Sequence, residues 1–184
     1  MTYLIKMKKW ILTLAFTVCM HSLFTQKFTP VDNGSVVKFS IKNFGLNVSG
    51  TFKGLKGTVL FDPANLAAAT INASVDVSTI NTGNNSRDNH LKKEEYFDAP
   101  KYAMIGFSSV KITNSAKPNS FFMEGKITIK GVTKKVSFPF TATPKADGYL
   151  FEGTFKLNRR DFAVGGNSLV MSDNLIVFLS VFSK

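Results

Sequence analysis

Apolar and polar residues alternate with a period of two from Val36 onward. This period is typical of β-strands that bury one face. The first such segment sets three apolar residues against a mostly polar face: Val37, Phe39 and Ile41 against Val36, Lys38, Ser40 and Lys42. The same period returns within residues 48–52, 58–61, 71–77, 105–107, 122–129, 136–140, 151–157 and 175–182.

Clusters of turn-forming residues separate these segments. Their side chains fix φ, tolerate left-handed backbone or bond their own main chain, so each cluster is expected to join neighbouring antiparallel strands. Short strands at this spacing predict an all-β sandwich or barrel. The clusters are Asp62-Pro63-Ala64-Asn65, in which Asp62 is interpreted as a turn residue, Lys117-Pro118-Asn119-Ser120 and Ala146-Asp147-Gly148.

Residues 82–100 break the alternation. Asn85 or Ser86 can cap the start of a helix, and residues 87–95 are mostly helix formers. We therefore expect a single short helix that crosses one end of the barrel.

The first 26 residues have the pattern of a secretory signal peptide: Lys6, Lys8 and Lys9 precede an apolar run over residues 10–24, and no acid occurs before Asp32. We expect cleavage near Gln26, which leaves residues 27–184 as one exported domain. The run is short and interrupted for a membrane span, so an uncleaved anchor is a weaker alternative. Lipid attachment at Cys19 is also disfavoured, because Val18 stands where a small residue is usual.

Charge and metal-binding residues exclude several functions. The formal net charge is +11, and removing the three signal lysines leaves 11 − 3 = +8, spread along the chain rather than clustered. That distribution argues against a nucleic-acid partner and suits a surface near anionic lipid headgroups. Residues 27–184 contain no Cys and one His, His90, so we expect no disulfide, no metal site and no cofactor.

Phenylalanine is abundant, with 18 copies, of which Phe16 and Phe24 lie in the predicted signal peptide. Its side chain has no polar group and favours dry interiors. A barrel of about eight strands either fills its interior with side chains or encloses one small ligand. Composition alone leaves both open.

The order of motifs resembles the YceI-like family of lipocalin-like, polyisoprenoid-binding exported proteins. The resemblance begins with VKFSIKNFGLNVSGTFKGLKGTVLFDP at residues 37–63. It continues through Arg87-Asp88-Asn89-His90-Leu91, Tyr96-Phe97-Asp98, Ile105-Gly106-Phe107, Gly131-Val132-Thr133-Lys134 and Arg159-Arg160-Asp161-Phe162. Two positions depart from the family pattern: Ala163 stands where Gly is usual, and Lys130 where an apolar residue is frequent.

This resemblance implies an extended antiparallel lipocalin-like β-barrel of about eight strands, with one short helix near its mouth. It also implies an elongated apolar cavity for a prenyl tail or a similar amphiphile. Among the inward-facing residues, we predict that ten contact the ligand: Phe39, Ile41, Phe52, Phe61, Val75, Phe107, Ile129, Phe138, Phe155 and Val177.

Polar residues near the expected mouth have two interpretations. They tie the helix to strand ends, or they hydrogen-bond a lipid headgroup; the first is favoured, although binding sites of this kind do carry a few placed polar groups. For Arg159, Arg160 and Asp161 the favoured interpretation is likewise a structural ion pair. The candidate polar mouth is Arg87, Asp88, His90 and Arg160.

The predicted function is non-catalytic binding, transport or storage of a long apolar amphiphile, a quinone or polyprenyl lipid above all, in the periplasm. A filled structural or protein-binding barrel is one alternative, and a lipid enzyme that uses His90 and Asp88 is another. Asp88 and His90 are two apart and do not face each other on a helix, which disfavours catalysis. Contact with a membrane surface and a homodimer are left open.

Overall fold

The computed structural model describes residues 26–184. The predicted signal peptide, including Cys19, lies outside these residues apart from Gln26. The strands are β1 (Lys27–Phe28), β2 (Val36–Asn43), β3 (Leu46–Leu60), β4 (Thr70–Asn81), β5 (Met104–Asn114), β6 (Ser120–Ile129), β7 (Val132–Lys145), β8 (Gly148–Asn158) and β9 (Met171–Ser183). One α-helix, α1 (Asn85–Leu91), and two 3-10 turns, η1 (Leu66–Ala68) and η2 (Arg159–Phe162), complete the described part.

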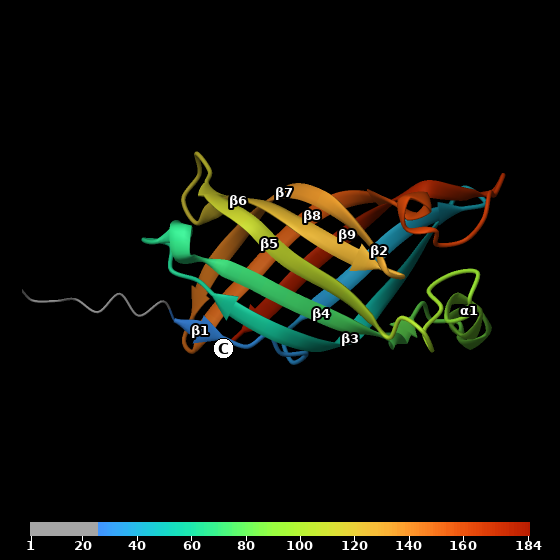
Figure 1. The fold of residues 1–184 in the computed structure, drawn as a ribbon, viewed down its shortest axis with the longest axis horizontal. Coiled ribbons are helices and arrows are strands. Elements are labelled where there is room, and N and C mark those ends of the chain that lie inside the picture. Colours follow the sequence, from blue (N-terminus) through green and yellow to red (C-terminus); the bar gives the residue numbers. More distant parts are fainter. Residues whose placement is uncertain (1–25) are drawn as a thin grey trace, which may run out of the picture.

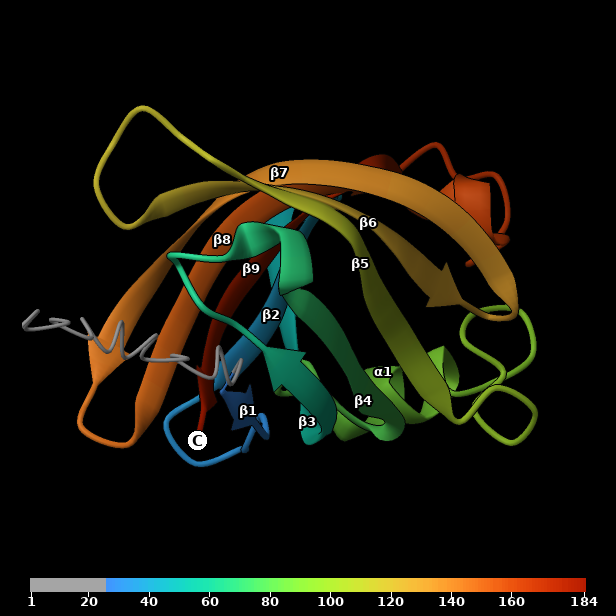
Figure 2. The ribbon, with the colours of Figure 1, turned by 60° about the vertical axis from the view of Figure 1, so that its left-hand side comes forward.

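Eight of these strands close into an antiparallel barrel. Their order is β3-β2-β9-β8-β7-β6-β5-β4, and β4 pairs back to β3, so the ring has no free edge. The short β1 extends the sheet by pairing with the end of β3, and its Phe28 is buried in the core. The strands curve round a common interior, with α1 at one end and β1 at the other (Figures 1 and 2). The predicted all-β barrel of about eight strands is confirmed, as are its three turns between neighbouring strands.

Alternation along the strands sorts side chains between the interior and the solvent. β6 shows this most regularly, because every second residue from Phe121 to Ile129 is buried while the residues between them are more exposed. In β2 the predicted faces hold, since Phe39 is part of an interior aromatic cluster. The hydrophobic pattern therefore sets which face of each strand points inward.

β3 is one strand of 15 residues where the sequence predicted two. Its first half pairs with β2 and its second half with β4 and β1, and irregular pairing around Lys53 lets it bend between them. Gly57 sits at φ 147°, and a Cβ there would lie 2.0 Å from the carbonyl oxygen of Asn72. Where β3 leaves β2, the carboxylate of Asp32 accepts from the backbone N–H groups of Gly54 and Leu55, both at 3.0 Å.

The helix differs in extent from the sequence expectation of residues 87–95. Its N-cap is Asn84, whose side chain accepts from the backbone N–H of Arg87, rather than Asn85 or Ser86. It ends at Leu91, after which tight turns reverse the chain. These turns bring Tyr96 and Phe97 onto the barrel core. The burial of these two rings outweighs the helix propensity of the residues before them.

Candidate functional site

The barrel encloses a cavity of about 260 Å³. All eight barrel strands contribute to its wall, and Leu91, Tyr96 and Phe97 border it at the helical end. The wall is largely Phe, Val, Ile and Leu, with few polar groups. An apolar interior of this kind favours hydrocarbon over water. The interior is not packed solid, which counts against the filled-barrel alternative.

Nine of the ten residues predicted from sequence to contact a ligand border this cavity. The exception is Phe61, which is only 1% exposed and lies outside the cavity wall. Direct ligand contact by the nine stays a prediction. They are Phe39, Ile41, Phe52, Val75, Phe107, Ile129, Phe138, Phe155 and Val177.

Phe61 instead forms the centre of an aromatic plug at the β1 end of the barrel. Its ring meets those of Phe121, Tyr149 and Phe151 edge-on, with centroid distances of 5.3, 5.3 and 5.2 Å. Edge-to-face contacts at this spacing are favourable for aromatic pairs. Phe151 also borders the cavity, so the plug forms the floor of the cavity at the β1 end.

Glycines opposite phenylalanines keep the interior open. A Cβ on Gly50 would lie 2.5 Å from the Cζ atom of Phe39, and one on Gly125 would lie 2.5 Å from the Cζ atom of Phe107. The two rings therefore rest where a side chain would otherwise stand, close against the barrel wall. The sequence did not reveal this packing of a phenylalanine ring over a glycine, although Gly50 stood at an inward position of a predicted strand.

At the α1 end, Thr82 holds two residues of the helix. Arg87 donates from Nε to Thr82 Oγ1 and from Nη2 to the Thr82 carbonyl oxygen, both at 2.8 Å. The buried carboxylate of Asp88 accepts from the backbone N–H of Thr82 at 2.9 Å. Within residues 26–184 the Nη1 of Arg87 has no hydrogen-bond partner, and Arg87 borders the cavity. Arg87 thus combines an anchored side chain with a free donor.

His90 and Asp88 do not form a reactive pair. His90 is exposed and its ring packs edge-on against Tyr96 at 5.0 Å between centroids, whereas Asp88 is bonded to Thr82. Neither residue borders the cavity. The contacts of Asp88 therefore fit the structural interpretation, in which its carboxylate ties α1 to Thr82, the residue after β4.

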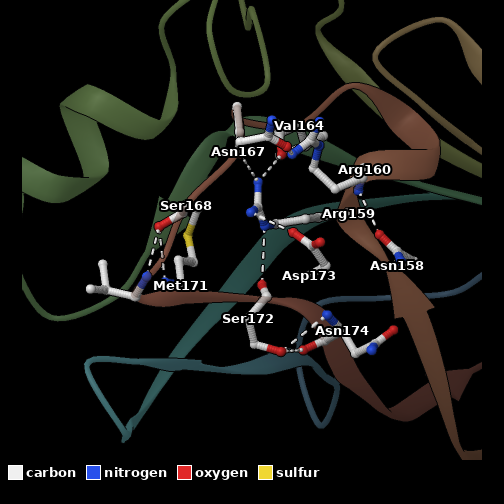
Figure 3. Close-up of polar contacts among 12 residues, drawn as sticks. Asn158, Arg159, Arg160, Val164, Asn167, Ser168, Met171, Ser172, Asp173 and Asn174 are labelled. Atoms are coloured by element: carbon white, nitrogen blue, oxygen red, sulfur yellow. Dashed lines mark hydrogen bonds and ion pairs between the residues drawn. The ribbon is translucent and has the colours of Figure 1, made fainter.

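A second arginine, Arg159, borders the cavity, whereas Arg160 of the candidate polar mouth does not (Figure 3). Arg159 is 4% exposed, and its guanidinium pairs with Asp173 on β9 rather than with the neighbouring Asp161. Arg160 is exposed and donates to Asn167. Which of these adjacent arginines faces the cavity is set by η2, a single 3-10 turn that the sequence pattern did not predict.

Two further observations concern the part of the chain that the structure describes. It holds no helix long and apolar enough to cross a membrane. It also holds no group of three or more His, Cys, Asp or Glu side chains arranged to bind a metal ion.

The fold and its cavity define the class of extended β-barrels with an apolar interior. The chain belongs to the YceI-like family, because a profile of the YceI-like domain matches residues 28–181. It is 28% identical to Protein YceI of Escherichia coli O6:H1 over 95% of this chain and 97% of that protein. The resemblance predicted from the motifs is thereby confirmed.

Solved structures share the fold. The crystal structure of BcnA from Burkholderia cenocepacia superposes with a TM-score of 0.77 at 25% identity, covering 82% of this chain and 96% of that one. A polyisoprenoid-binding domain from Saccharophagus degradans superposes with a TM-score of 0.68 at 12% identity, covering 85% of this chain and 97% of that one.

Proposed function

We propose that this protein binds one long apolar amphiphile inside the barrel and carries or stores it without transforming it. The observation that carries the proposal is the apolar cavity, with the Phe61 plug at one end and Arg87 bordering the other. The tail would lie among the nine cavity-wall residues, with its polar end near Arg87.

An isoprenoid is the ligand class that we propose. It is supported by the family resemblance and by the polyisoprenoid-binding domain that shares this fold. Burial of apolar carbon yields about 0.8 kcal/mol per methylene, so ten carbons contribute roughly 8 kcal/mol. Association costs offset several kcal/mol of that gain. A tail of two or more isoprene units is therefore needed for useful affinity.

Export and a periplasmic location stay predictions from residues 1–26, and a homodimer stays a prediction as well. Absence of catalysis is part of the proposal. It is supported by the separation of His90 from the cavity and of Asp88 from His90. If His90→Ala leaves ligand binding intact but abolishes turnover of a bound lipid, the protein is an enzyme and this part of the proposal fails.

The deciding experiment is mass spectrometry of lipids extracted from protein purified from its own cells without denaturation. We expect a stoichiometric isoprenoid. The wild type is compared with Val177→Trp, which blocks the cavity, and with Ile176→Trp, whose side chain lies outside the cavity wall and is 36% exposed. Lipid should be lost from Val177→Trp and kept in Ile176→Trp. Lipid-free wild type that also fails to bind prenyl probes would refute the proposal.

A further inference from the structure

Four large apolar side chains project into solvent at the α1 end of the barrel. Phe44 lies in the turn between β2 and β3 and Leu46 is the first residue of β3; they are 74% and 73% exposed. Leu169 and Val170 precede β9 and are 106% and 41% exposed. The backbone N–H of Phe44 donates to the carbonyl oxygen of Val170 at 2.9 Å, so the two loops form one unit. We call these four residues the apolar tip. In Figure 1 both loops extend outward at the end where α1 lies.

The backbone at Phe44 is unfavourable for a phenylalanine. Phe44 and Gly45 have φ of 50° and 76°, the pattern of a two-residue type I′ hairpin turn. Such turns favour Asn, Asp or Gly at the first position, because a bulky side chain at positive φ is strained. Burial does not offset this strain, since the ring is mostly in water. Neither the hairpin nor the core of this chain therefore accounts for an aromatic ring here.

The apolar tip is continuous with the cavity. Ile41 and Val48, which flank the Phe44 turn on β2 and β3, border the cavity, and so does Met171, which follows Val170. A molecule that leaves the cavity at this end therefore passes apolar side chains before it reaches water. Contiguous exposed apolar surface of this kind marks a contact with a partner or a membrane.

The charge around the apolar tip suits an anionic partner. Lys42 on β2 and Arg160 on η2 are exposed beside it. Exposed acids also lie near it: Asp161 beside Arg160, Asp173 in its pair with Arg159, and Glu94 and Glu95 after α1, whose backbone carbonyls accept from Lys130 and Gly165. The exposed Lys93 and the half-buried Lys130 lie beside these glutamates and add positive charge at the same end. The whole chain has 23 basic and 12 acidic residues, and without Lys6, Lys8 and Lys9 the described part keeps a net charge of 20 − 12 = +8. Basic residues near inserted apolar side chains are typical of proteins that bind anionic bilayers.

We propose that the apolar tip inserts into the surface of an anionic lipid bilayer, so that the open end of the cavity faces the membrane and exchanges its ligand there. The exchange step rests on the proposed function, whereas the docking step does not. A long isoprenoid is insoluble in water, and a cavity that opens directly onto the bilayer avoids exposing its tail. The tip residues would contact acyl chains while Lys42 and Arg160 contact phosphates.

Docking is tested by flotation with vesicles of phosphatidylethanolamine and phosphatidylglycerol at a 3:1 ratio. The protein is produced from the complete chain, and its intact mass establishes that all variants have the same N-terminus. We expect the wild type to float and the double variant Phe44→Asn, Leu169→Ser to partition at least 10-fold more weakly. The control is Phe122→Thr, which removes a 39% exposed ring two residues after the start of β6, and β6 starts at the end of the barrel away from α1 (Figure 1); it should float as the wild type does.

The double variant is expected to remain folded, because Asn-Gly is the favoured sequence for a type I′ turn. Wild type that does not float, or a double variant that floats equally well, would overturn docking, and the apolar tip would then be a site for a protein partner. A second readout is Phe44→Trp, whose emission should shift to the blue when vesicles are added. An unshifted emission would contradict insertion of the tip.

Loading experiments separate docking from the proposed function. A prenyl quinone is presented to each variant either in detergent micelles or in the same vesicles. We expect the double variant to load about 10-fold more slowly from vesicles and at the wild-type rate from micelles. Flotation without any loading would leave docking standing and refute the proposed function. Loading at equal rates from vesicles in both proteins would refute the exchange step.

Discussion

The guanidinium of Arg159 joins η2 to β9 through an ion pair with Asp173, at 2.6 Å between Nη2 and Oδ1. The side chain of Arg159 is 3% exposed, while that of Asp173 is 47% exposed. Arg159 also donates to the carbonyl oxygens of Ser172, Val164 and Gly166, at 3.0, 3.0 and 2.9 Å. Since a half-exposed ion pair contributes little, we attribute most of the stabilisation to the three carbonyl bonds.

Replacing Arg159 should therefore cost far more stability than replacing its acidic partner. Arg159→Met leaves three carbonyls and one carboxylate without their donor, and we expect a loss of about 3–5 kcal/mol in the free energy of unfolding. Asp173→Asn keeps an acceptor oxygen and should cost about 1 kcal/mol. Urea denaturation measures both. The control is Arg160→Met, an exposed neighbour expected to cost below about 1 kcal/mol; equal losses at Arg159 and Arg160 would contradict the assignment.

Ala163 occupies a left-handed backbone conformation, with φ 52° and ψ 35° at the end of η2. The YceI-like resemblance places Gly at this position, and the conformation gives the physical reason, because Gly has no Cβ to strain. Ala163 is exposed, so its methyl group gains little from packing. We expect Ala163→Gly to stabilise the protein by about 1 kcal/mol in urea denaturation. Gly45→Ala, at φ 76°, should do the opposite; a destabilised Ala163→Gly would show that the methyl group matters.

The sequence predicted the wall of the cavity well because strand alternation is local. Phe39 and Val177 lie on different strands, yet each was assigned to the interior from its neighbours alone, and both border the cavity. How far along the barrel axis a residue lies, by contrast, does not follow from its neighbours in the sequence. Phe52 lies in β3 and Phe61 directly follows that strand. Both are buried, but only Phe52 borders the cavity, since Phe61 lies at the plugged end. No period in the sequence distinguishes the two.

The polar residues were harder to assign from sequence. Of the candidate polar mouth, Arg87 borders the cavity and Arg160 does not, whereas the adjacent Arg159, which the sequence did not single out for the mouth, does. Whether any of these residues contacts a ligand stays a prediction. Asp173, the partner of Arg159, lies 14 positions away, beyond the reach of any local pattern. The exposed Phe44 was visible in the sequence, but its positive φ and its contact with Val170 needed the tertiary structure.

Asp76 makes stability depend on pH at acidic values. Hydrogen bonds from the side chain and backbone N–H of Ser78 lower the pKa of the Asp76 carboxyl below 3.8, and Lys56 and Lys92 act in the same direction against a small effect of burial. Because the folded pKa is depressed, this contribution is present above 3.8 and is lost as pH falls through the folded pKa. We expect the free energy of unfolding of Asp76→Asn to fall less steeply than that of the wild type between about pH 4 and 2. Parallel urea midpoints for both proteins across that range would contradict this.

Gly50 controls how much of the cavity Phe39 occupies. A Cβ at Gly50 would lie 2.5 Å from Cζ of Phe39 and 2.9 Å from Cγ2 of Thr82, so Gly50→Ala must displace the ring toward the cavity. We expect binding of a prenyl probe to weaken about 10-fold, equivalent to about 1.4 kcal/mol, because the displaced ring takes space from the tail. The control is Gly166→Ala, which lies outside the cavity wall and where an added Cβ meets nothing within 4 Å. Fluorescence titration measures both, and circular dichroism verifies the fold. Unchanged affinity in Gly50→Ala would mean that the tail does not pass Phe39 and lies deeper, nearer the aromatic plug.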